Sequence, residues 1–275
     1  MKKALCIGIN YEGTSSELSG CINDAHNWAA ALSARGYHAY TLIEKQATRA
    51  VVLSLVGSII SESHRGDSLV ITFSGHGTQV PDENGDEADG MDEANCCHDC
   101  FDGGLILDDE WWRLFRSKAP GVQIAFISDS CHSGTVARKI RATIPGDVEA
   151  KKKFIHYRML KAGSWKVGGD TRDPQAPRLF EEGGWLKDAE GAARVPWPVL
   201  LMSGCQDNEY SYDAVIGGQP CGAFTHAALA ALKRMPAGAT FNDWFLAIRM
   251  KLPSRQWPQT PRLIGSYLKK PALFG

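Results

Sequence analysis

The sequence predicts an α/β fold in which a central, mainly parallel sheet is covered on both faces by helices. Short apolar runs bounded by Gly, Asp or Asn recur along the 275 residues, and such runs are typical of strands buried on both faces. Stretches with helical periodicity lie between them. Strands and helices therefore alternate along the chain, which is the pattern of a parallel sheet.

The predicted elements follow in chain order. Apolar runs predict five strands, at residues 4–9, 37–43, 68–73, 122–128 and 199–203. Helical patterns predict five helices, at residues 23–35, 48–63, 108–117, 222–235 and 241–252. The first helix is expected to end before Gly36, because glycine tolerates the backbone conformation that closes many helices.

Two stretches interrupt this alternation. Residues 81–109 are rich in glycine and contain seven carboxylates between Asp82 and Glu93, which predicts a surface loop. Residues 135–198 are rich in Lys, Arg, Gly and Pro and show no strong period, which predicts an exposed connector open to proteolysis. We expect one domain over residues 1–275, composed of a first part at 1–134, an insert or linker at 135–197 and a second part at 198–275.

The composition indicates a soluble globular protein, because 44% of the residues are hydrophobic and 22% are charged. A net charge of −1 gives no overall field that would attract nucleic acid. No stretch approaches the roughly 20 apolar residues needed to cross a bilayer, so we expect no membrane association. Eight cysteines are too few for a disulfide-stapled secreted scaffold of this length, which favours reduced thiols and a cytoplasmic location.

A cysteine and a histidine follow two of the predicted strands. Cys131 lies in the segment DSCHSG (residues 129–134), and His76 lies in SGHG (residues 74–77). The carboxyl ends of parallel strands meet at one edge of a sheet, so the two side chains can form a nucleophile and its base there. A buried structural cysteine is the alternative for Cys131, and His132 is a rival base, although a turn at Cys131 would point it away from the sulfur.

Four segments together resemble the motifs of the metacaspases and their bacterial relatives, the orthocaspases, within the caspase-fold peptidases. They are GINY at residues 8–11, GCINDA at 20–25, SGHG at 74–77 and DSCHSG at 129–134. The resemblance covers residues 3–135 and resumes near residue 198. It implies a caspase-like three-layer α/β/α sandwich and a cysteine endopeptidase acting on proteins or peptides.

The resemblance also implies roles for the motif residues. His76 polarises the attack, Cys131 forms the acyl-enzyme, and the backbone N–H groups of Gly77 and Cys131 form the oxyanion hole. Physical chemistry agrees, because a thiolate near an imidazole is a strong nucleophile near neutral pH and donors fixed by a glycine turn need no reorganisation.

Two acids are closely tied to these motifs. Asp129 shares a strand face with Cys131, since side chains two residues apart point the same way, and Asp24 lies near the start of a predicted helix. The residues alone leave open that Asp129 caps the strand end and that Asp24 complements the helix dipole.

The resemblance implies that both acids, with Cys21 and Ser74, bind an Arg or Lys side chain. Paired carboxylates would also repel an acidic side chain, so we expect cleavage after Arg or Lys. Asp207 and Asp213 are expected to add to the rim of this pocket, with ordinary loop acids as the alternative.

Such a specificity would make the connector a substrate of the enzyme itself. We expect self-cleavage at one or more of its basic residues, the candidates being Arg138, Arg141, Lys153, Arg158, Arg172, Arg178 and Arg194. The alternative is a solvated linker that is never cut.

By the same resemblance, Asp92, Asp108 and Asp109 match positions that bind calcium in calcium-dependent metacaspases, and hard oxygen ligands suit that ion. Those enzymes carry a further aspartate where this chain has Arg138, whose charge would oppose the ion. We therefore expect that no cofactor is required.

Two other metal motifs are incomplete. Residues 82–93 partly match an EF-hand loop, but its sixth position is Glu87 rather than glycine. The run CCHDC at residues 96–100 is dense in zinc ligands, yet Cys205 and Cys221 lack the spacing of a second ligand pair. The alternatives to a peptidase are a catalytically silent scaffold with this fold and a metal-binding regulatory module.

Overall fold

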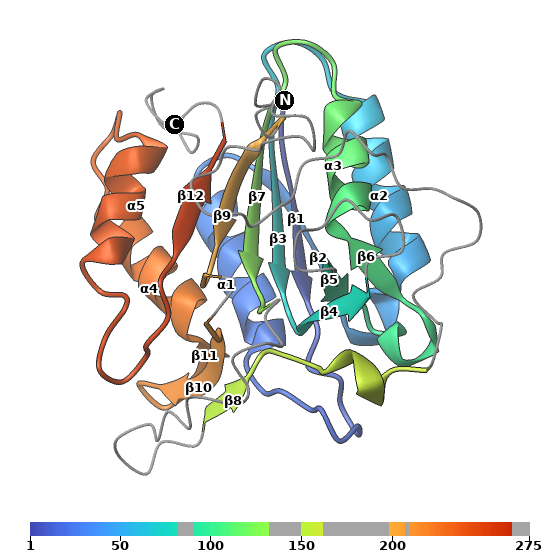
Figure 1. Ribbon diagram of the computed structural model, residues 1–275. Helices are drawn as coiled ribbons and strands as arrows, with labels where there is room; N and C mark the ends of the chain where they lie inside the picture. The colour runs from blue at the N-terminus through green and yellow to red at the C-terminus, as the bar shows by residue number, and fades with distance from the viewer. Residues whose placement is uncertain (82–90, 132–149, 162–197, 207–208, 266–275) are drawn as a thin grey trace, which may run out of the picture.

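The structure of the chain, a computed structural model, describes residues 1–81, 91–131, 150–161, 198–206 and 209–265. Its centre is a six-stranded sheet (Figure 1). In spatial order the strands are β2 (His38–Ile43), β1 (Lys2–Gly8), β3 (Ser68–Ser74), β7 (Gln123–Asp129), β9 (Leu200–Ser203) and β12 (Arg262–Ile264). The first five are parallel, and β12 pairs antiparallel with β9 at one edge.

Helices cover both faces of this sheet. One face carries α1 (Cys21–Ser33), α4 (Ala223–Leu232) and α5 (Phe241–Arg249), and the other carries α2 (Arg49–Ser61) and α3 (Asp108–Arg116). Side chains alternate between the faces as a two-sided core requires: Leu5 and Ile7 pack with α2 and α3, whereas Ala4 and Cys6 pack with α1, α4 and α5. The predicted α/β/α sandwich is confirmed.

Over the ranges that the structure describes, no helix combines the length and apolarity that crossing a bilayer requires.

The order of the strands creates a crevice at the carboxyl edge of the sheet. Strand β1 lies between β2 and β3; the helix that follows β1, α1, lies on one face, and the helix that follows β3, α3, lies on the other. The chain segments that leave β1 and β3 therefore diverge, and open α/β sheets bind ligands where this happens. Strand β7 lies beside β3 with Asp129 opposite Ser74, so it adds its end to the same crevice.

Two small antiparallel sheets flank that edge (Figure 1). One contains β4 (Gly77–Pro81), β5 (Met91–Cys96) and β6 (Leu105–Leu107), and the other contains β8 (Ala150–Lys152), β10 (Tyr212–Ile216) and β11 (Gln219–Gly222). Three short 3₁₀ helices complete the described elements: η1 (Glu44–Gln46), η2 (Cys100–Asp102) and η4 (Tyr157–Met159).

The prediction of a surface loop over residues 81–109 is wrong where the structure describes that stretch. Residues 91–109 form β5, η2, β6 and the start of α3, and most of their side chains are buried. Buried polar groups such as the Asn95 amide and the Glu93 carboxylate are hydrogen-bonded to residues outside this stretch. The Asn95 amide accepts from Trp111 Nε1 at 2.9 Å and donates to Ser130 Oγ at 2.9 Å.

Candidate active site

The ends of β3 and β7 bring two backbone N–H groups to one point. The N–H groups of Gly77 and Cys131 both donate to the carbonyl oxygen of Lys153, at 3.0 Å and 3.2 Å. These are the two donors that the sequence assigned to an oxyanion hole. Two N–H groups converging on one carbonyl oxygen polarise that carbonyl toward nucleophilic attack.

The Cys131 thiol is fully buried, and the backbone N–H of the same residue is the one that contacts this carbonyl oxygen. Its Sγ atom accepts a hydrogen bond from the backbone N–H of Ser211. The Sγ atom of Cys205 lies 3.9 Å away, and the hydrogen bond to Cys131, together with burial, raises the pKa of the Cys205 thiol well above its ordinary value. Cys205 is therefore a protonated neighbour of the candidate nucleophile.

The ring of His76 is buried and oriented by its neighbours. Its Nε2 atom lies 2.6 Å from the carbonyl oxygen of Ser16, so Nε2 carries the proton and Nδ1 presents a bare lone pair. Burial lowers the pKa of His76 to about 4, which keeps the imidazole neutral near pH 7. Within the described residues, Nδ1 has no hydrogen-bond partner and the ring makes no hydrogen bond to the Cys131 thiol. The rival base His132 lies outside the described residues.

The side chain of Lys153 enters a closed pocket below the two strand ends. Its Nζ atom lies 3.1 Å from Asp129 Oδ2 and 3.2 Å from Asp24 Oδ2, and it donates to Ser74 Oγ at 2.9 Å. Lys153 has no exposed surface, and its two carboxylate partners are almost as completely buried. Three of the residues assigned to a basic-residue pocket thus surround one of the chain's own lysines.

Electrostatics favour a cation in this pocket. Burial alone would lower the pKa of Lys153, but Asp129, Cys21, Asp24 and Asp213 outweigh it and raise that pKa well above its ordinary value. Burial raises the pKa of Asp24 to about 6, against the opposing effect of the Lys153 ammonium. The pocket therefore holds a charged ammonium group, and the charge of this group favours the ionised form of Asp24.

Second partners hold the two acids in place. Asp129 Oδ2 accepts from the backbone N–H and the hydroxyl of Thr225, at 3.1 Å and 2.7 Å, and its Oδ1 accepts from the Ser211 hydroxyl. Asp24 accepts from the backbone N–H of Gly222 at 3.0 Å. These contacts come from the chain after residue 200, so the second part of the chain completes a pocket that the first part begins.

The remaining predicted pocket residues lie close by in supporting positions. Asp213 accepts from the backbone N–H groups of Ser19 and Gly20, at 2.7 Å and 2.9 Å, and so fixes the loop that leads into α1. Cys21 is buried at the first turn of α1, and burial raises the pKa of its thiol well above its ordinary value. Asp207 lies outside the described residues.

Gly222 shapes the pocket in a way that the sequence did not reveal. A Cβ atom built on this residue would clash with the Asp129 carboxylate and the Lys153 ammonium, and it would lie 2.8 Å from Asp24 Oδ2. The absence of a side chain at this position makes the space that the ammonium occupies. The sequence showed only a glycine as the first residue of a predicted helix.

The backbone around Lys153 is bound as an extended strand. β8 pairs antiparallel with β10, the Lys153 N–H donates to the Ser211 carbonyl at 2.9 Å, and the Ile155 N–H donates to the Gly77 carbonyl at 3.0 Å. Ile155 and Leu160, just downstream, are buried in the core cluster of α2 and α3. The prediction of an exposed connector is therefore wrong for Lys153, Ile155 and Leu160, which strand pairing and apolar packing bury, whereas residues 151, 152, 158, 159 and 161 are exposed.

The other candidate self-cleavage residues are not seated in this pocket or cannot be placed. Arg158 is exposed, and its guanidinium lies 5.8 Å from the centre of the Tyr157 ring. Those outside the described residues are Arg138, Arg141, Arg172, Arg178 and Arg194.

The predicted calcium ligands are buried at the start of α3 and on β5. Asp92, Asp108 and Asp109 are each less than 5% exposed, and Asp109 forms an ion pair with Arg113 at 3.5 Å. In the part of the chain that the structure describes, no group of three or more His, Cys, Asp or Glu side chains is arranged to hold a metal. No chemical step is assigned to calcium.

The thiols of the CCHDC run belong to the apolar core. Cys96, Cys97 and Cys100 are fully buried in the cluster beneath α2 and α3. Burial raises the pKa of the Cys96 and Cys97 thiols well above their ordinary value, which opposes the thiolate form that zinc requires. Most of the partial EF-hand match, residues 82–90, lies outside the described residues.

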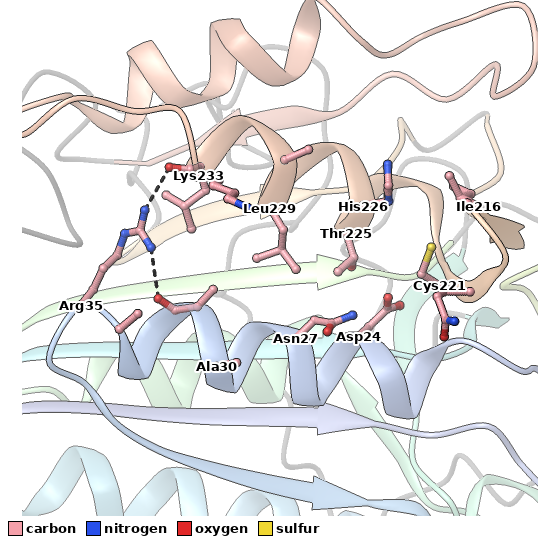
Figure 2. Close-up of a pocket in the computed structure, with 16 residues that line it drawn as sticks. Asp24, Asn27, Ala30, Arg35, Ile216, Cys221, Thr225, His226, Leu229 and Lys233 are labelled. Atoms are coloured by element: carbon pink, nitrogen blue, oxygen red, sulfur yellow. Dashed lines mark hydrogen bonds between the residues drawn. The ribbon is translucent and has the colours of Figure 1, made fainter.

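A second cavity of about 790 Å³ lies behind the pocket, between α1 and α4 (Figure 2). Asp24, Cys221 and Thr225 line the end nearest the pocket. At the opposite end, Arg35 donates to the carbonyl oxygens of Ala31 and Leu232, at 3.1 Å and 2.9 Å, and so joins the two helices. Asp24 is shared between this cavity and the lysine pocket.

Comparisons with known proteins identify relatives of this chain. A family model described as the metacaspase, peptidase C14 domain, matches residues 2–139. Metacaspase-1 of Cryptococcus neoformans is 33% identical over 287 aligned residues, which cover 97% of this chain and 62% of that protein. Metacaspase-1 of Ajellomyces capsulatus is 33% identical, with 97% of this chain and 80% of that protein covered. The chain thus spans less than two thirds of the length of the Cryptococcus protein.

Two solved structures extend the comparison. A crystal structure of a Geobacter sulfurreducens protein is 31% identical with a TM-score of 0.71, covering 98% of this chain and 97% of that one. The crystal structure of caspase-1 from Spodoptera frugiperda has a TM-score of 0.60 at 12% identity, covering 100% of this chain and 89% of that one. The second likeness concerns the fold alone.

Proposed function

Since this chain belongs to the metacaspase family of C14 peptidases, we propose that it is a cysteine endopeptidase that cleaves peptide bonds after lysine or arginine. One observation carries the proposal: Lys153 has its ammonium between Asp24 and Asp129 and its carbonyl oxygen between the N–H groups of Gly77 and Cys131. This is the arrangement that a substrate needs for acyl transfer to a thiol.

In the proposed mechanism, Cys131 Sγ attacks the carbonyl carbon of the residue in the pocket. The thiol proton passes to Nδ1 of neutral His76, and the two N–H groups stabilise the negative charge on the oxygen. The C–N bond then breaks, His76 gives the proton to the leaving amine, and a thioester remains on Cys131. Water hydrolyses the thioester and releases the carboxylate product.

Charge supports the preference for basic side chains. Two buried carboxylates and the Ser74 hydroxyl form a site that an ammonium or a guanidinium satisfies. An aspartate there would add a third negative charge without a partner, which is prohibitively costly in a buried site. The substrates are therefore proteins or peptides with Lys or Arg at the position before the cut, called P1.

The first substrate in this proposal is the chain itself. The Lys153–Phe154 bond occupies the cleft with the P1 side chain, the P1 carbonyl and the flanking backbone all bound. Self-processing would therefore cut after Lys153. The competing idea is that the segment blocks the cleft and is never cut.

Peptide hydrolysis and the mass of the purified protein together test the proposal. Fluorogenic peptides that differ only in P1 should be cut when P1 is Lys or Arg, left intact when it is Asp, and left intact in every case by Cys131→Ala. Mass spectrometry of the native protein should find fragments that end at Lys153 and begin at Phe154. Faster cutting after Asp, or the same fragments in pure Cys131→Ala protein, would contradict the proposal.

A further inference from the structure

Tyr210 faces the side of the bound segment that does not enter the lysine pocket. Side chains alternate along an extended chain, so Lys152 and Phe154 point away from the pocket that Lys153 enters. Both reach the same ring: Lys152 Nζ lies 3.8 Å from the centre of Tyr210, and the centre of Phe154 lies 6.2 Å from it at 64°. One aromatic side chain therefore contacts the residues on both sides of P1.

The position of Tyr210 is fixed by its surroundings. Its side chain is 7% exposed and belongs to the core cluster that contains Cys131 and Cys205. Burial, and secondarily the proximity of Cys131, raises the pKa of its hydroxyl, which keeps the ring neutral. A neutral aromatic face attracts a cation placed above it, and an edge-on ring beside it gains packing energy.

The contact made by Lys151 is of a different kind. Its Nζ atom donates to the backbone carbonyl oxygen of Glu17 at 2.7 Å, and among the described residues it does not lie over an aromatic ring. A lone carbonyl at an exposed position accepts from many donors. The residue at P3, two before P1, is therefore a matched reference for the residue at P2.

We propose that Tyr210 determines specificity at two further subsites, binding a Lys or Arg side chain at P2 with its face and an apolar or aromatic side chain at P1′ through a tilted ring contact. The preferred substrates are then dibasic sequences followed by a hydrophobic residue. This inference rests on the proposed function, because it assigns the neighbouring subsites of the same cleft.

Peptides that keep Lys at P1 and Phe at P1′ test the P2 subsite in the native enzyme. We expect kcat/KM to fall by about twofold to fivefold when P2 changes from Lys to acetyl-lysine or Gln, the range of an exposed cation–π contact. The same changes at P3 should have a smaller effect. Acetyl-lysine keeps the aliphatic stem and removes the charge, so equal cutting of the Lys and acetyl-lysine peptides would overturn the inference.

Variants of Tyr210 then identify the group responsible. Tyr210→Phe keeps the ring and should retain the P2 preference, whereas Tyr210→Leu should cut the Lys and Gln peptides equally. If Tyr210→Leu still prefers Lys at P2, the preference comes from other charges in the cleft and the role of the ring is refuted. Peptides with P1 changed from Lys to Asp separate the inference about Tyr210 from the proposed function. If the native enzyme does not select Lys over Asp at P1, the proposed function itself is overturned.

Discussion

Replacing Gly222 with alanine tests the lysine pocket with a single methyl group. The backbone of Gly222 has φ −69° and ψ 135°, which alanine adopts without strain. The added Cβ would nevertheless occupy the space of the ammonium between Asp24 and Asp129. The substitution therefore fills the pocket without changing any charge.

The expected loss follows from the contacts that the ammonium makes. A cation held back from the pocket loses two carboxylate partners at 3.1–3.2 Å and the Ser74 hydroxyl at 2.9 Å. Breaking a buried, hydrogen-bonded charge pair costs about 2–5 kcal/mol, so kcat/KM for a P1 lysine peptide should fall by about thirtyfold to several thousandfold.

A second glycine-to-alanine change provides the control. Gly57 lies in α2, and a Cβ there would meet only Leu114 Cδ1 at 3.7 Å, an ordinary contact. Gly57→Ala should keep native kcat/KM. Cooperative unfolding on heating would show that Gly222→Ala is folded. If the folded variant still cuts P1 lysine peptides at the native rate, the reasoning is refuted, because basic side chains would then bind elsewhere.

Other predictions concern self-cleavage, pH and calcium. Lys153→Gln should abolish the self-cleavage detected by mass spectrometry. Arg158→Gln, a change at an exposed basic residue nearby, should leave self-cleavage intact. The opposite result would show that the chain is cut after Arg158 and not after Lys153. Asp24 has a pKa of about 6 in the occupied pocket, and this pKa is higher when no ammonium is present to lower it. KM for P1 lysine peptides should therefore rise as the pH falls toward about 6 and level off below it, and a KM that is flat above pH 6 would contradict this. Because Asp109 is already paired with Arg113, hydrolysis rates should be equal with added calcium and with a calcium chelator, and activation by calcium would reverse that expectation.

Five of the six strands of the central sheet and the helices that cover it were predictable, because continuous apolar runs mark strands buried on both faces and apolar residues at helical spacing mark helices. All five predicted strands and all five predicted helices are present, with ends shifted by a few residues. The sheet of β4, β5 and β6 was missed because its strands contain buried polar side chains such as Asn95, Asp92 and Glu93. Composition marks such residues as exposed, whereas hydrogen bonds to distant neighbours allow their burial.

The site was predictable only in part. Motif resemblance pointed to Asp24, Ser74 and Asp129, and the structure brings these three residues together around one ammonium. No local signal distinguished Lys153 from the other basic residues of the connector. Its position depends on the pairing of β8 with β10, in which Lys152 lies opposite Tyr212, 60 residues later in the chain. The sequence of either strand alone does not determine such a long-range strand register.

The anchoring of the bound segment is asymmetric, and this determines what a cut would release. Downstream of Lys153, Ile155 and Leu160 are embedded in the core, so the new amino end would stay where it is. Upstream, β8 is held by backbone pairing to β10, and its Lys151 and Lys152 side chains are exposed. The severed upstream tail would end at Lys153, whose buried ammonium lies between Asp24 and Asp129, so it would leave β10 as a vacant edge for the next polypeptide only after those ion pairs break.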